Sequence, residues 1–314
     1  MVITAKNGAS GNGSIVNKVV ATSPSEIPLP EKYVNLGLTT GYNPVAAEDL
    51  RLYVTGLTGE GKTTFLRSIP DSWCLDFENA ANAVPGARGA YFNIHSIARK
   101  LKRDSYSVYR DIITNLIEDG KNGRCPCKRI IFDTHDEWVG FEARALATEK
   151  MVEHIGEYGR EGHGWSLVHA RCQKVLGDLE GAGYTWAVVG HLTYVNETDP
   201  ITKSQVTRIR PLLAKGSVGP IVRKAELHIT IYASTTNEKV EQEHQVSGKV
   251  IKSKIDKEVT RYHIYTRPTE AKTMEGKRRG VPTLPAKIEV PLVGGWDVLK
   301  AAYEKAVQES RGIV

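Results

Sequence analysis

Short β-rich runs alternate with segments of helical spacing between positions 50 and 190. The runs are Leu50–Thr55, Trp73–Phe77, Tyr91–Ile94, Arg129–Phe132 and Tyr184–Gly190. The segment between the third and fourth runs repeats apolar residues every three or four positions from Val108 to Ile117. Asp104 or Ser105 can cap this predicted helix and Gly120 ends it. This alternation predicts an α/β fold in which helices flank a mostly parallel sheet.

The pattern changes to strands after Ala225. Ala225–Ala233 and Glu258–Thr266 flank a charged hairpin near Ser247–Gly248. We expect these strands to extend the sheet as an antiparallel edge on its C-terminal side. The spacing of apolar residues in Asp297–Gln308 predicts a closing amphipathic helix.

Three parts of the chain differ in composition. Residues 1–46 are rich in Gly, Ser, Asn, Thr and Pro and have no clear periodicity, which predicts a flexible N-terminal arm. Residues 47–292 carry the α/β pattern and form the predicted core. Residues 293–314 contain the predicted closing helix.

Composition and charge exclude some classes of protein. A chain of 314 residues with 40% hydrophobic residues can bury a full core, which excludes a wholly disordered chain and a disulfide-stapled mini-fold. The net charge of +6 permits a polyanionic partner without establishing one. The four cysteines lack framework spacing, and no apolar run reaches the roughly 20 residues that span a bilayer. We therefore expect a cytoplasmic protein that does not contact a membrane.

The segment Gly56–Thr63 fits the phosphate-loop pattern G-x-x-x-x-G-K-[ST] at every fixed position. It follows a β-rich run and opens a predicted helix, which is the context that supports the motif. The residues expected around the phosphates are Gly56, Leu57, Thr58, Gly59, Glu60, Gly61, Lys62, Thr63 and Thr64. Lys62 is expected to reach the β- and γ-phosphates and the Thr63 hydroxyl to bind Mg²⁺. The motif therefore predicts ATP and Mg²⁺ as the bound nucleotide and cofactor.

A second acidic position lies about 70 residues downstream. Asp133 ends the apolar run Arg129–Phe132, which matches the Walker B strand whose carboxylate holds Mg²⁺ directly or through water. Asp136 and Glu137 follow and are alternative catalytic carboxylates in a different branch of these proteins. The pair Cys125 and Cys127 has no two further ligands nearby, so we interpret it as a turn and not as a zinc site.

In their order along the chain, these motifs resemble RecA-like P-loop ATPases. They are most similar to the short phage ATPases of the Sak type, which are single-strand annealing proteins, and to their "AAA domain" relatives. The resemblance covers about residues 48–292. Besides the phosphate loop it rests on Leu75–Glu78, Ile130–Thr134, Tyr158–Arg160 with Trp165, Val188–His191, and Gly276–Gly280 before Leu284 and Pro285.

The resemblance implies roles for particular residues of the hydrolytic site and its neighbours. Glu78 corresponds to the general base that polarises the attacking water, and His191 to the residue that senses the γ-phosphate. Two loops, about residues 154–165 and 194–218, would face the axis of a ring or filament. The candidates for contact with single-stranded DNA are Arg160, Lys203, Arg208 and Arg210. The candidates for a cationic finger that reaches a neighbouring subunit's nucleotide are Lys277 and Arg279, with Lys215 as the alternative.

The function expected from this reading is a DNA-dependent ATPase that acts as a homo-oligomer on single-stranded DNA. The resemblance places it in phage-type homologous recombination or strand annealing, beside a single-strand DNA-binding protein. Three alternatives stay open: a replicative helicase-like motor or loader, an ATP-binding switch or assembly factor with little hydrolysis, and a small-molecule kinase.

Overall fold

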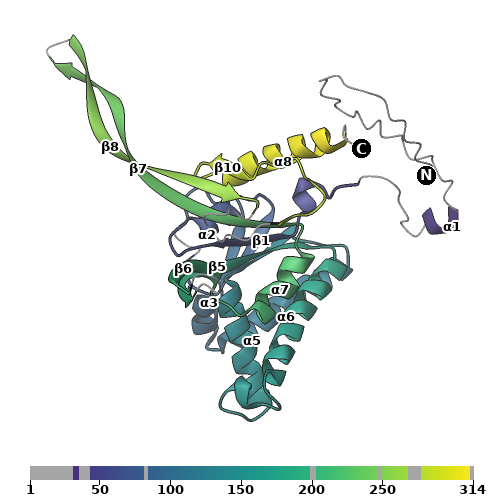
Figure 1. Cartoon of the computed structure of the whole chain (residues 1–314). Helices are drawn as coiled ribbons and strands as arrows, with labels where there is room; N and C mark the ends of the chain where they lie inside the picture. Colours follow the sequence, from purple (N-terminus) through teal and green to yellow (C-terminus); the bar gives the residue numbers. More distant parts are fainter. Residues whose placement is uncertain are drawn as a thin grey trace, which may run out of the picture.

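The computed structural model describes residues 31–34, 43–80, 84–198, 203–246, 249–267 and 277–311. Within these ranges ten strands form one sheet (Figure 1). They are β1 Leu52–Gly56, β2 Ser72–Asp76, β3 Ala90–Asn93, β4 Arg129–Asp133, β5 Thr185–Thr198, β6 Gln205–Pro211, β7 Leu227–Val246, β8 Lys249–Tyr265, β9 Lys277–Arg278 and β10 Lys287–Val290.

The strand order is β10-β8-β7-β1-β5-β4-β2-β3, with β6 beside β5 and β9 beside β7. The strands from β7 to β3 pair in parallel, whereas β8 and β10 pair antiparallel at the other end of the sheet. The predicted fold class is therefore confirmed, including the antiparallel strands on the C-terminal side. The phosphate loop follows β1 and Asp133 ends β4, and β5 lies between these two strands.

Helices cover both faces of the sheet. The main helices are α2 Lys62–Arg67, α3 Ile94–Leu101, α4 Ser105–Lys121, α5 His135–Glu149, α6 His163–Gly181, α7 Lys215–Lys224 and α8 Gly295–Arg311. The shorter ones are α1 Glu31–Val34 and the 3-10 turns η1 Ala47–Asp49 and η3 Ile155–Glu157. As predicted, Asp104 caps α4, where its side chain accepts a hydrogen bond from the Ser107 N–H at 2.8 Å.

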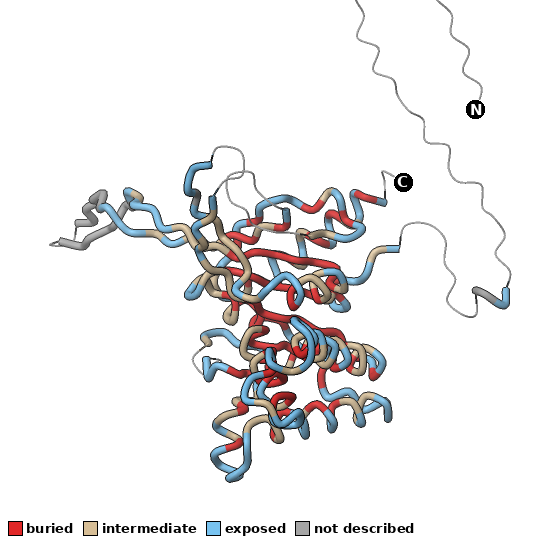
Figure 2. The backbone as a smooth tube through the Cα atoms, turned by 60° about the horizontal axis from the view of Figure 1, so that its bottom comes forward, coloured by how far each residue is buried: buried red, intermediate tan, exposed pale blue. Residues whose placement is uncertain are grey.

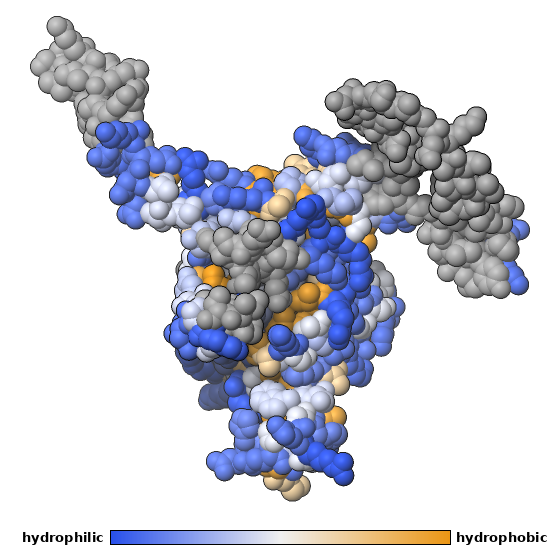
Figure 3. Space-filling model, viewed as in Figure 1, coloured by the Kyte–Doolittle hydropathy of each residue, from blue (hydrophilic) through white to orange (hydrophobic). Residues whose placement is uncertain are grey.

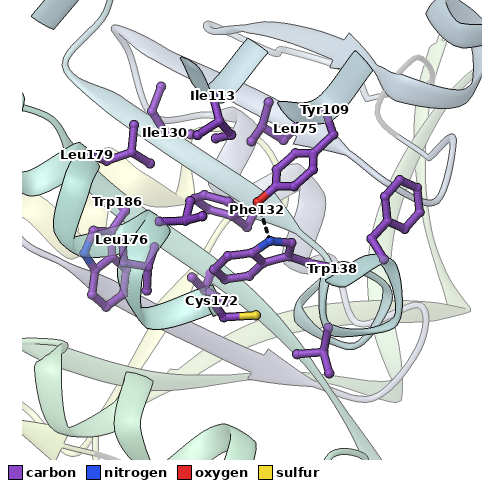
Figure 4. Close-up of a cluster of buried hydrophobic side chains, with 14 of the residues drawn as sticks. Leu75, Tyr109, Ile113, Ile130, Phe132, Trp138, Cys172, Leu176, Leu179 and Trp186 are labelled. Atoms are coloured by element: carbon purple, nitrogen blue, oxygen red, sulfur yellow. Dashed lines mark hydrogen bonds between the residues drawn. The ribbon is translucent and has the colours of Figure 1, made fainter. Parts of the chain in front are cut away.

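Two clusters of buried side chains lie on opposite faces of the sheet, and buried residues concentrate in the central strands (Figure 2). One cluster joins the sheet to α4, α5, α6 and α7, and the other joins it to α2 and α8. In the first, the buried Trp138 ring donates a hydrogen bond to the Tyr109 hydroxyl at 2.7 Å (Figure 4). The start of α5, which carries Asp136, is therefore fixed to α4 through a packed aromatic pair.

The C-terminal hairpin is longer than the sequence pattern predicted. β7 and β8 pair in continuous register from Thr230 opposite Tyr265 to Val246 opposite Lys249, and they run out from the body as a two-stranded ribbon (Figure 1). The turn expected near Ser247–Gly248 lies outside the described residues. The described outer part of the ribbon is mostly hydrophilic (Figure 3). The sequence pattern predicted strands from apolar residues, so it did not predict this outer part.

The segment 194–218 is not the loop that we expected from the resemblance. β5 continues to Thr198 and pairs antiparallel with β6, and α7 begins at Lys215. The segment therefore forms a β-hairpin followed by a helix, apart from residues 199–202, which lie outside the described residues.

The predicted closing helix is α8, which belongs to the core packing. Near the start of the core, the Tyr303 hydroxyl donates to the Val45 carbonyl at 2.8 Å, and Lys300 forms an ion pair with Glu48. Most of the predicted arm, residues 1–30 and 35–42, lies outside the described residues. Across the described part of the chain, none of the helices combines the length and apolar character needed to cross a membrane.

Candidate nucleotide-binding site

The phosphate loop connects β1 to α2 and depends on glycine at defined positions. Gly59 and Gly61 have φ values of 84° and 82°, a region that side chains with a Cβ disfavour. A Cβ on Gly56 would lie 2.8 Å from the Ile231 carbonyl oxygen, because the loop packs closely on β7. The Glu60 carboxylate also accepts a hydrogen bond from the Ala233 N–H. The loop is thus held against β7 in a conformation that depends on its glycines.

Lys62 points into the site rather than into solvent. Its side chain is 5% exposed, and the Nζ donates to the Leu57 carbonyl at 2.8 Å across the loop. Burial lowers the pKa of Lys62, while the negative charges of Asp133, Glu78 and Asp136 oppose that shift. The ammonium group therefore lies within the field of the acidic groups that the neighbouring strands contribute.

Asp133 ends β4 and is fully buried. Neither carboxylate oxygen has a hydrogen-bond partner among the described residues. Burial raises the pKa of Asp133 to about 7, and the nearby Thr63 hydroxyl and Lys62 oppose that shift. A buried carboxylate without partners, beside a threonine hydroxyl, has the donor chemistry that Mg²⁺ prefers. Asp133 and Thr63 therefore fit the predicted metal site.

A third group of side chains surrounds Glu78. The Thr134 hydroxyl donates to Glu78 Oε1 at 2.8 Å, and the same carboxylate oxygen lies 3.7 Å from His191 Nδ1. His191 Nδ1 lies 2.8 Å from Asp136 Oδ2, and the His191 backbone N–H also faces Asp136 Oδ1. The structure therefore brings together Glu78 and His191, which the resemblance singled out separately.

Electrostatics in this cluster favour a charged pair. The hydrogen bond with Asp136 raises the pKa of His191, against the opposing effect of burial. Burial raises the pKa of Asp136, but the hydrogen bond and the charge of His191 outweigh it, so the net shift is downward. Asp136 thus holds the imidazole of His191 in place, and a role of its own as a catalytic carboxylate stays a prediction.

Sequence reasoning missed the part played by Thr134 and left that of Asp136 open. Both follow the Walker B strand, which marks them as neighbours of the site, but their partners come from β2 and β5. Asp76 braces the loop after β2. Its Oδ1 accepts hydrogen bonds from the Glu78 and Ala80 N–H groups at 3.1 and 3.2 Å.

The predicted DNA-contacting residues lie in two places. Arg208 and Arg210 are on β6, where their Nε atoms lie 3.7 and 3.0 Å from the Glu197 carboxylate of β5. Lys203 is exposed just before β6, and Arg160 is exposed between η3 and α6. Lys215 is the first residue of α7 and is exposed. The two arginines are therefore partly neutralised within the hairpin, and DNA contact by any of these residues stays a prediction.

The predicted finger residues contact the end of a helix in their own chain. Lys277 Nζ donates to the carbonyl oxygens of Val222, Arg223 and Ala225, each at 2.9 Å. Arg279 donates to the Arg223 carbonyl at 3.1 Å. In this structure both side chains cap the C-terminal end of α7, and a contact with a neighbouring subunit's nucleotide stays a prediction.

These features define the nucleotide-binding domain of a P-loop ATPase. They are a phosphate loop with the buried Lys62, the buried Walker B residue Asp133, and the polar side chains of Glu78, Asp136 and His191. The comparison with protein families agrees. The chain belongs to the family described as "AAA domain", whose model matches residues 48–279.

No curated protein matches the chain. Among solved structures, a KaiC-like protein from the hyperthermophilic archaeon Pyrococcus horikoshii OT3 is similar, with 13% sequence identity and a TM-score of 0.29. That match covers 73% of this chain and 83% of the archaeal chain.

Proposed function

We propose that the protein binds ATP with Mg²⁺ and hydrolyses it to ADP and phosphate. One observation carries this proposal: Lys62, Asp133 and Glu78 follow or end the adjacent strands β1, β4 and β2, and His191 of β5 lies at the same edge of the sheet, opposite Gly56. Such an arrangement supplies a phosphate ligand, a γ-phosphate contact, a metal ligand and a base around one point.

Each side chain has a distinct task in this reaction. Lys62 binds the β- and γ-phosphates, and Mg²⁺ held by Thr63 and Asp133 would draw charge from the same oxygens. Glu78 accepts the proton of the water that attacks the γ-phosphorus, and Thr134 fixes the direction of its carboxylate. His191, anchored by Asp136, donates to the γ-phosphate and stabilises the charge that develops on it.

The finer proposal is that single-stranded DNA stimulates this hydrolysis, in a homo-oligomer that acts in phage-type recombination or strand annealing beside a single-strand DNA-binding protein. The β5–β6 hairpin supports it because the hairpin begins at the γ-phosphate contact. The Leu212 N–H bonds the His191 carbonyl at 2.9 Å, which closes the hairpin at that residue. Tyr194, 62% exposed on the outer part of β5, offers a stacking surface for bases, and Lys203 offers a cation.

The test is steady-state ATP hydrolysis with and without single-stranded DNA. We expect wild type to be stimulated several-fold. Tyr194→Ala should need at least about 5-fold more DNA, since stacking contributes roughly 1–3 kcal/mol per base, and Lys203→Ala should also need more because it loses a cation that can neutralise a phosphate. Each variant's rate without DNA is its own reference. Lys174→Ala, a matched change on the exposed face of α6, should respond to DNA like wild type.

The outcomes distinguish the DNA-stimulated ATPase from the alternative functions. Hydrolysis that DNA does not change would leave the ATPase and overturn the DNA proposal. Tight ATP binding without hydrolysis would instead favour the nucleotide switch. Stimulation accompanied by directional movement along DNA would favour the helicase-like motor.

A further inference from the structure

A groove lies at the junction of β8 and the chain that follows β10. It is lined by residues 259–262 and 289–292 and has a volume of about 600 Å³, within the range of small-molecule sites. β10 ends at Val290, opposite Tyr262, while β8 continues into the projecting ribbon. Beyond Tyr262, toward the ribbon, no described strand pairs with the edge of β8 that β10 occupies. The groove opens where the pairing of β10 with β8 ends.

The groove touches one flank of the phosphate loop. A Cβ built on Gly61 would meet Leu292 Cδ1 at 3.0 Å and the Tyr262 ring at 3.4 Å. These two groove-lining side chains therefore lie against the loop where it enters α2. The polar cluster of Glu78, Asp133 and His191 comes from β2, β4 and β5, on the opposite side of β1 from β7 and β8.

This placement gives the direction of a bound nucleotide. The γ-phosphate belongs beside the polar cluster, which contains the proposed general base Glu78 and the metal ligand Asp133. The remaining part of the nucleotide then leaves the loop on the Gly61 flank. We propose that the groove between β8 and residues 289–292 binds the nucleoside part of a purine nucleoside triphosphate, with its base stacked on Tyr262. This inference rests on the proposed function, which supplies the phosphate loop and the position of the γ-phosphate.

The lining residues suit such a ligand. Tyr262 is half-buried and packs against the core cluster beside α2 and α8, so its ring is held in place before a ligand binds. Leu292, Val290 and Pro291 add aliphatic surface, and flat aromatic bases bury well between such groups. A purine, with two fused rings, covers more of this surface than a pyrimidine.

The rim of the groove is polar. Arg261 bonds the Glu238 carboxylate at 2.9 Å and lies 3.2 Å from Glu289. Arg261 and Glu289 alternate with Tyr262 and Val290 along β8 and β10, so their polar groups lie at the edge of the groove, toward the other face of the sheet. A ribose or the edge of a base that extends past the tyrosine ring would meet these groups rather than further apolar surface.

The test separates the nucleoside from its phosphates. Binding of Mg·ATP and of Mg·tripolyphosphate to the full chain is measured by calorimetry for wild type, Tyr262→Ala and Tyr262→Phe. We expect Tyr262→Ala to weaken ATP binding roughly 10-fold, as loss of one base–aromatic stack does, and to leave tripolyphosphate binding unchanged. Tyr262→Phe keeps the stacking surface and should bind ATP like wild type. ATP and GTP should bind more tightly than CTP.

The control is Tyr265→Ala, the same change on β8 outside the groove, which should bind both ligands like wild type. Equal weakening of ATP and tripolyphosphate in Tyr262→Ala would show that Tyr262 only supports the loop and would overturn the inference. Unchanged ATP binding, or a wild type that does not distinguish ATP from tripolyphosphate, would also overturn it. If wild type bound neither ligand, the proposed function would fail together with the inference.

Discussion

Replacing Glu78 with glutamine is expected to lower the rate of ATP hydrolysis by about 10²- to 10⁴-fold, the usual contribution of a general base. A carboxamide keeps the size of the side chain and can still accept the Thr134 hydrogen bond, but it cannot take the proton of the attacking water. ATP affinity should stay within about threefold of wild type, because Glu78 acts in the transition state rather than in binding. Single-turnover hydrolysis and equilibrium ATP binding measure the two effects separately.

The matched control is Glu137→Gln, which removes the neighbouring carboxylate on the first turn of α5. We expect it to hydrolyse ATP at nearly the wild-type rate. If Glu137→Gln lost activity and Glu78→Gln kept it, the base would be Glu137 and the assignment of Glu78 would be wrong.

The substitution Asp133→Asn should lower the rate of hydrolysis and remove a pH dependence of the free energy of unfolding. The unfolded chain loses the Asp133 proton near pH 4, whereas burial raises the pKa in the folded protein to about 7. Between these values the folded state binds more protons, so the free energy of unfolding falls as the pH rises through this window. A difference of about three pH units between the two pKa values corresponds to roughly 4 kcal/mol at pH 8. An asparagine side chain cannot ionise, so the variant should lose this pH dependence.

Chemical denaturation of the nucleotide-free protein in EDTA at pH 5.5 and pH 8 measures this difference. Asp133→Asn should lose less stability between the two pH values than wild type, while its Mg²⁺-dependent hydrolysis falls by at least about 10²-fold. Asp178→Asn, which changes an exposed aspartate on α6, should keep the wild-type pH dependence. Equal pH dependence in wild type and Asp133→Asn would contradict the raised pKa of the buried Asp133 carboxylate.

Local patterns predicted the centre of the fold well. The phosphate loop, the apolar strand ending in Asp133 and the Asp104 cap are each encoded within a few consecutive residues. The class of sheet followed from strands that alternate with helices, because that alternation leaves few ways to bury the apolar faces.

Features that depend on partners distant in the chain could not be predicted in the same way. Thr134 meets Glu78, and Asp136 meets His191, only because β2, β4 and β5 lie side by side. The sequence places Lys277 in a basic run that is expected to be exposed. In the structure its amino group caps the end of α7, which lies more than 50 residues before it in the chain. The hairpin of β5 and β6 has two arginines on β6 and no strongly apolar face, so its sequence did not predict strands.

The central claim is that this site hydrolyses ATP through the phosphate loop and its metal ligands. The most direct measurement is phosphate release from ATP by purified wild type and Lys62→Ala, with Mg²⁺ and with EDTA, in the presence of single-stranded DNA. Our account predicts hydrolysis by wild type with Mg²⁺ and at least about 10²-fold less in EDTA or in Lys62→Ala. Equal rates in wild type and Lys62→Ala, or no Mg²⁺-dependent hydrolysis by wild type, would contradict it.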